Sequence, residues 1–209
     1  MQKRHQSSID IIGPQYRIPH FVDLVIVRKV TTLTDNFTVT DINGKIFFNL
    51  KAASLISLYD HRLLLDAAGK TVVLTLQRKV IFFMVKTRHD RWEAFRGEST
   101  ELKDLIFSVK RSSIMFQLKT KLDVFLASNT KEEICDFKVK GSWFERSCVV
   151  YAGKSHNIVA QMHKKEIVES VAFGKDNLTV RVYPNIDYAF MVAVILILDE
   201  VNQEKIQQQ

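Results

Sequence analysis

Pairs of basic residues that directly follow apolar segments have the clearest chemical potential in this sequence. The pairs are Arg28-Lys29, Arg78-Lys79, Lys110-Arg111 and Lys164-Lys165. Guanidinium and ammonium groups bind phosphate through charge-assisted hydrogen bonds, and each basic residue beside an anionic membrane contributes about 1 kcal/mol. The candidate residues for binding an anion or a lipid headgroup are therefore Arg78, Lys79, Lys110, Arg111, Lys164 and Lys165.

The same pairs also have a plainer interpretation. Charged residues at strand ends protect a β-sheet from edge-to-edge aggregation, and such charges are common, which favours this second interpretation. If the apolar segments are equivalent strands, several pairs gather at one rim of the fold and form a cationic ring.

The remaining reactive residues match no catalytic or metal-binding motif. Cys148 and His163 could act as a nucleophile and its base, but nothing in their spacing demands it. Gly153-Lys154-Ser155 lacks the earlier glycine of a phosphate-binding loop, and Asp41–Gly44 lacks the later acidic residues of a calcium loop. The six histidines show no metal-ligand spacing. We therefore expect no enzymatic activity, no catalytic or metal-binding residue and no cofactor.

Composition and charge indicate a globular domain with an acidic partner. Of the 209 residues, 46% are hydrophobic and 25% are charged, which is ordinary for a globular protein. The net charge of +7 favours contact with a membrane surface or with nucleic acid. The first residues, MQKRHQSSID, lack the apolar core of a signal peptide. We expect a cytoplasmic protein, acting also at the plasma-membrane periphery or in the nucleus, with Cys135 and Cys148 as reduced thiols.

The basic pairs and the cysteines lie on or beside segments with a strand–turn–strand pattern. Asp41-Ile42-Asn43-Gly44 and Asp66-Ala67-Ala68-Gly69 each separate two apolar runs, and Asp first with Gly fourth predicts a type I turn with a left-handed glycine. In CDFKVKGSWFERSC, Gly141-Ser142 predicts a type II′ turn, which would place Cys135 opposite Cys148. Many short strands at near-regular spacing predict a sandwich or a barrel, and only barrel closure removes all sheet edges.

The C-terminal run YAFMVAVILIL is apolar on every side and must be surrounded by lipid or protein. As a helix it would be about 16 Å long, and a membrane span needs about 20 apolar residues. Its β-branched residues also allow a buried strand, but its length favours a helix, with Asp187 as the N-cap. We therefore predict an all-β protein with one central helix: a closed antiparallel β-barrel that encloses a hydrophobic helix at about 187–202.

The sequence predicts a single folded domain with one flanking segment on each side. Residues 1–20 contain Pro14 and Pro19 and are expected to form a flexible N-terminal arm. The barrel domain is expected to span residues 21–202, and residues 203–209 are expected to form a polar tail.

Several long motifs carry a resemblance to a known family. They are LTDNFTVTDINGK, LLLDAAGK, HDRWEAFRG, QLKTKLDVFLA, CDFKVKGSWFERSCVVYAGKS, IVAQMHKK and GKDNLTVRVYPNIDYAFMVAVILILDEVN. From Pro19 to Asn202 the chain resembles the LURP-one-related family of plants, which is similar to the C-terminal domain of tubby proteins and to phospholipid scramblases. The resemblance implies a barrel of about twelve strands threaded by a hydrophobic C-terminal helix. The segment 80–87 is longer and more apolar than the family pattern, which leaves the strand register around 80–91 open.

The resemblance implies a non-enzymatic regulator tethered to membranes. Our leading hypothesis is a binding domain that contacts anionic phospholipid headgroups, such as phosphoinositides, through its basic surface pairs. The alternative is a transcription-linked regulator in plant defence that binds nucleic acid or a protein partner. No recognition helix supports this alternative, because the strong helix candidate is apolar. Lipid scrambling would need a membrane span or an interior cavity, and the sequence predicts neither.

Overall fold

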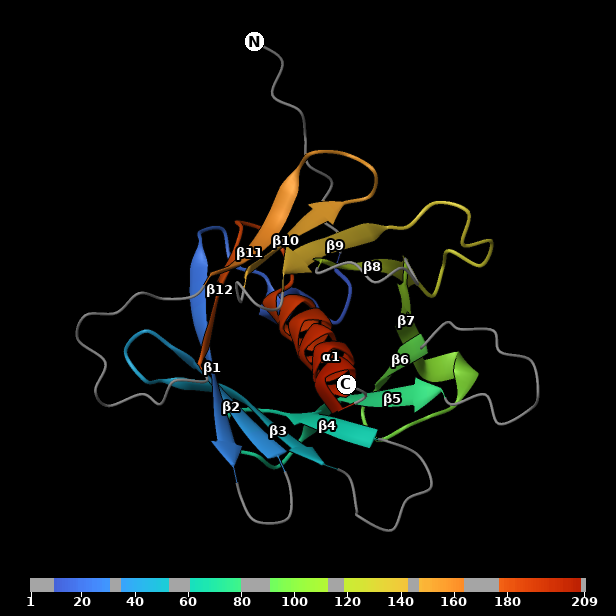
Figure 1. Cartoon of the computed structure of the whole chain (residues 1–209). Coiled ribbons are helices and arrows are strands. Elements are labelled where there is room, and N and C mark those ends of the chain that lie inside the picture. Colours follow the sequence, from blue (N-terminus) through green and yellow to red (C-terminus); the bar gives the residue numbers. More distant parts are fainter. Residues whose placement is uncertain are drawn as a thin grey trace.

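The structure is a closed antiparallel barrel around one helix (Figure 1). The computed structural model describes residues 10–30, 35–52, 61–79, 91–112, 119–142, 147–163 and 177–207. Consecutive strands pair with each other, and β1 pairs with β12 to close the ring. The strands are β1 (Val22–Val30), β2 (Asp35–Asp41), β3 (Ile46–Ala52), β4 (His61–Leu65), β5 (Val72–Lys79), β6 (Arg91–Arg96), β7 (Leu105–Arg111), β8 (Lys119–Leu126), β9 (Phe137–Ser142), β10 (Ser147–Ala152), β11 (Ile158–His163) and β12 (Leu178–Val182). The predicted fold class is confirmed.

The helix α1 (Tyr188–Gln207) fills the barrel. Every residue from 189 to 199 is at most 4% exposed. Inward-facing rings pack directly on it: the Phe107 and Phe137 ring centroids each lie 4.9 Å from that of Phe190. The buried strand residues and the apolar helix belong to one continuous core. The helix is therefore the central layer of the hydrophobic core, because an all-round apolar helix has no face that can contact water.

Asp187 holds the beginning of this helix, as predicted. Its Oδ1 accepts a hydrogen bond from the Phe190 N–H (3.0 Å), which is the N-cap bond. Its Oδ2 accepts from the N–H groups of Ile12 (2.8 Å) and Gly13 (3.3 Å), which lie before β1. Burial raises the pKa of Asp187, although these three amides favour the ionised carboxylate. The Asp187 carboxylate therefore connects the segment before β1 to the first turn of α1.

Both predicted type I turns are confirmed. The Gly44 N–H donates to the Asp41 carbonyl (3.1 Å), and the Gly69 N–H donates to the Asp66 carbonyl (3.0 Å). Both glycines have positive φ, at 85° and 68°. In each turn the aspartate Oδ1 also accepts the N–H of the residue four positions on, at 2.9 Å, which fixes the loop geometry.

The predicted hairpin at Gly141-Ser142 is wrong. Both residues are still in β9, where Gly141 lies opposite Cys148 and Val139 lies opposite Val150. A Cβ atom at position 141 would lie 2.6 Å from the Cys148 Cβ, so the glycine serves close packing and not a turn. Cys135 precedes β9 and is not the cross-strand partner of Cys148.

The expected boundaries also change. Residues 10–20 do not form a free arm, because Ile12 is 5% exposed within the core and Tyr16 packs on Tyr188. A short 3₁₀ turn, η1 (Pro14–Tyr16), begins at a proline, as helical turns commonly do. The helix continues to Gln207 and not to 202, so most of the expected tail is helical. Residues 1–9 and the segment 80–90, whose register was left open, lie outside the described residues.

Replacing Asp187 tests its double role. Asp187→Ala should lower the free energy of unfolding by about 3 kcal/mol, because about 1 kcal/mol belongs to the helix cap and the rest to two buried amides left without an acceptor. Asp187→Asn keeps one oxygen for the cap and should lose less. Urea denaturation measures both variants, and an Ala variant as stable as the parent would contradict the assignment.

Candidate functional site

The predicted convergence of basic pairs follows from the barrel topology. The helix begins after β12, and we call that rim the cap rim and the opposite one the far rim. In an antiparallel ring every odd-numbered strand ends at the far rim, so Arg28-Lys29, Arg78-Lys79 and Lys110-Arg111 all end there. Lys164 and Lys165 follow β11 and lie outside the described residues.

Strand alternation splits these pairs between the two faces of the sheet. Arg28 lies opposite Phe37, Arg78 opposite Trp92 and Arg111 opposite Leu122, and these three partners belong to the core. Residues directly opposite each other share a face, so the three arginines point toward the barrel interior. Lys79 and Lys110 therefore point outward.

A further inward-facing arginine at the far rim pairs with an acidic residue of α1. Arg62, which lies opposite the core residue Leu76, makes a two-pronged contact with Glu200, at 2.9 Å from Nε to Oε1 and 3.3 Å from Nη2 to Oε2. Asp199 is 4% exposed in the preceding position. A carboxylate in a half-buried site is stabilised by a cation that pairs with it. Arg62 therefore has a structural use, because it holds the Glu200 carboxylate of α1 inside the far rim.

The outward candidates are engaged by carboxylates. Lys79 Nζ lies 3.1 Å from Glu93 Oε1, and Lys110 forms an ion pair with Glu132. Arg91 joins both, at 3.1 Å from Glu93 and 2.8 Å from Glu132. Partial burial acts to raise the pKa of Glu132, but hydrogen bonds from Arg91 and Lys110 outweigh it and lower the pKa. In this network three basic groups share two carboxylates, so both Lys79 and Lys110 are already engaged within the protein.

Two other outward lysines lack such a partner. Lys121 of β8 lies directly opposite Lys140 of β9. Within the described ranges neither has an ion-pair partner, while the Lys140 ammonium lies 5.2 Å from the Tyr151 ring centroid. Neither Lys121 nor Lys140 was among the candidate residues predicted from the sequence. Their pairing depends on the register between β8 and β9, and no turn signal in the sequence gives that register.

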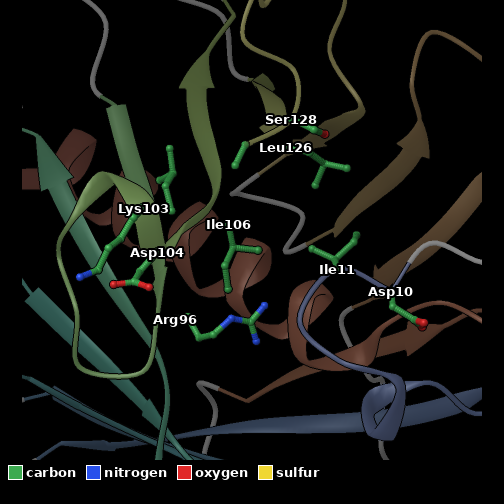
Figure 2. A pocket seen from close by; sticks show the side chains of 10 residues that line it. Asp10, Ile11, Arg96, Lys103, Asp104, Ile106, Leu126 and Ser128 are labelled. Carbon is green, nitrogen blue, oxygen red and sulfur yellow. The ribbon is translucent and has the colours of Figure 1, made fainter.

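A hollow of about 320 Å³ lies at the cap rim (Figure 2). Its apolar wall includes Ile11 and Ile106, and Figure 2 shows the Arg96 guanidinium below Ile106 in this view. The charged groups of this hollow are already engaged. Arg96 donates to the Ile12 carbonyl (3.0 Å), and Asp104 accepts from Ser99 (2.6 Å) in the turn that contains η2 (Leu102–Asp104). These bonds attach the N-terminal segment to the barrel.

The two thiols are buried and not activated. Burial raises the pKa of Cys148 to about 12. Burial and the nearby Asp123 also raise the pKa of Cys135. A nucleophilic cysteine needs a lowered pKa and access to solvent, so neither thiol has the environment of a catalytic group.

The described part of the chain contains neither a cluster of metal ligands nor a helix that could cross a membrane. There, no three His, Cys, Asp or Glu side chains lie close enough to hold a metal ion. In the same ranges, no helix combines the length and apolarity that a membrane crossing requires.

These features define a class of protein: a closed antiparallel barrel filled by one apolar helix. Within that class the chain belongs to the LURP-one-related family, whose pattern matches residues 22–199. It is 55% identical to Protein LURP-one-related 15 of Arabidopsis thaliana, over 95% of this chain and 88% of that protein. It is 50% identical to Protein LURP1 of the same plant, over 95% of this chain and 92% of that protein. A protein of the same plant solved by X-ray crystallography superposes with a TM-score of 0.71 at 46% identity, covering 92% of this chain and 98% of the other.

The Glu200→Gln variant tests the structural role of the Arg62–Glu200 ion pair. It should lower the free energy of unfolding by about 1–3 kcal/mol, because Arg62 would keep its charge in a half-buried site without a carboxylate. Glu101→Gln is the matched control, since the Glu101–Lys103 pair has side chains 68% and 72% exposed and contributes almost nothing. Equal unfolding midpoints for the two variants would contradict this role.

Thiol reactivity tests the environment of the cysteines. Native protein at a pH of about 8.5, the ordinary thiol pKa, should incorporate little iodoacetamide at Cys148 or Cys135. The urea-unfolded chain should label fully at both, and peptide mass spectrometry measures the difference. Rapid labelling of native Cys148 would show that its raised pKa and burial are wrong.

Proposed function

We propose that this protein is a non-enzymatic binding domain that attaches to anionic phospholipid headgroups, phosphoinositides among them, through the outside of its barrel. The observation that carries the proposal is the filled interior. Because residues 189–199 of α1 occupy the space where other barrels bind small molecules, a ligand must be recognised on the outer surface.

Charge favours an anionic partner on that surface. The chain carries 30 Lys and Arg against 23 Asp and Glu. Several carboxylates, such as those of Glu93, Glu132 and Glu200, already form ion pairs within the protein. The basic residues that outnumber the acidic ones give the protein a net positive charge. A positive surface of this kind is attracted to the negative potential of a phospholipid leaflet.

The family members to which the chain is similar carry names that state no activity. The absence of an activated thiol and of an enclosed substrate cavity in the described structure is in keeping with a binding role. No observation favours nucleic acid over lipid, and competition with duplex DNA distinguishes the two partners.

Vesicle sedimentation tests the proposal. The protein should be retained on phosphatidylcholine vesicles that contain phosphatidylinositol bisphosphate and not on phosphatidylcholine alone. Retention should fall as NaCl rises, because the screening length shrinks from about 10 Å at 0.1 M to about 3 Å at 1 M. Equal retention on neutral vesicles, or none on anionic ones, would refute lipid attachment. Complete release by duplex DNA at constant ionic strength would favour a nucleic-acid partner.

A further inference from the structure

We propose that Lys121 and Lys140 form a phosphate-binding site on the outer face of β8 and β9, which takes the phosphate of an anionic lipid headgroup. The proposal rests on the proposed function and names the surface that would perform it. This surface differs from the described far-rim candidates, because Lys79 and Lys110 are engaged by carboxylates while Arg78 and Arg111 point inward.

The backbone register forces the two ammonium groups together. Lys121 and Lys140 are directly opposite on adjacent antiparallel strands. Their sequence neighbours Leu122 and Val139, which are also opposite each other, are fully buried, so both lysines point outward. Opposite residues have Cβ atoms about 4.5–5.5 Å apart, and like charges in this arrangement destabilise a sheet. Binding an anion between them would turn this repulsion into attraction.

The neighbouring row of the sheet shows how such repulsion is normally removed. There Asp123 lies opposite Lys110 on one side and Lys138 on the other, and its Oδ1 is 3.4 Å from the Lys138 Nζ. A carboxylate thus separates two lysines in that row. In the row of Lys121 and Lys140, among described residues, no carboxylate stands at an adjacent position.

The flanking positions are occupied by uncharged residues. Ser112 lies beside Lys121 and donates its N–H to the Lys121 carbonyl (3.0 Å), while Val149 lies opposite Lys140. An incoming phosphate would therefore meet two cations and an exposed hydroxyl, with the nearest carboxylate, Asp123, already engaged by Lys138.

Tyr151 positions one of the two cations. The Lys140 ammonium lies over the Tyr151 ring at 5.2 Å from the centroid, a cation–π contact. Lys140 itself is exposed and Lys121 is half-buried. The site is thus built on two paired strands, and the backbone positions of both lysines are fixed before an anion binds. A terminal phosphate monoester, with a charge near −2 at neutral pH, matches two ammonium groups.

A double variant separates this site from the general charge of the protein. Lys121→Gln with Lys140→Gln keeps both side-chain stems and removes both charges. Vesicle affinity should fall about thirty-fold, the factor that corresponds to about 1 kcal/mol for each of two lysines at an anionic surface. Lys51→Gln with Lys70→Gln is the matched control, since it also removes two charges and both lysines are exposed. Equal affinity losses in the control and the double variant would overturn the site and leave the proposed function standing.

A soluble probe gives an independent readout. Inositol hexakisphosphate should raise the unfolding midpoint of the wild-type protein more than NaCl at the same ionic strength, and this excess should vanish in the double variant. An unchanged response of the double variant to the probe would refute the site. A normal probe response without vesicle retention would refute lipid as its source and the proposed function with it.

Discussion

The structure depends on enclosing a helix that has no polar face. The residues from 189 to 199 need apolar contacts all round, and only a closed sheet supplies them without leaving unpaired strand edges. Such a helix is stable in place only if its two polar ends are satisfied as well. Asp187 does this at the cap rim, while Glu200 with Arg62 and Asn202 with Thr120 do it at the far rim.

This constraint divides the side chains of every strand between two faces. In a barrel filled by its own helix, each strand contributes to the core with one set of side chains and to the outer surface with the other. The basic pairs illustrate the consequence. Adjacent residues of a strand cannot face the same side, so Arg78 and Lys79 serve opposite faces although they are neighbours in sequence. A count of basic pairs therefore overstates the cationic surface.

The sequence was sufficient to predict what depends on local chemistry. The apolar run from Tyr188, the Asp–Gly turns and the cap at Asp187 each carry their own signal, and each was confirmed. What failed depends on distant partners. Gly141 has the residue type of a turn, but its small size is required by Cys148 across the sheet. Ile12 lies in a segment that contains Pro14 and Pro19, yet it is buried because Asp187, far along the chain, accepts its N–H.

The same reasoning explains why the candidate site was not visible in the sequence. Lys121 and Lys140 are far apart along the chain, and only the register of β8 on β9 makes them opposite. Shifting β9 by two residues would place Lys138 opposite Lys121 and leave Asp123 without its lysine. The barrel fixes that register, because a core residue, Val139, must meet Leu122 above the helix. The repulsive pair on the surface is therefore imposed by packing in the interior, and a core this continuous can tolerate it without an anion.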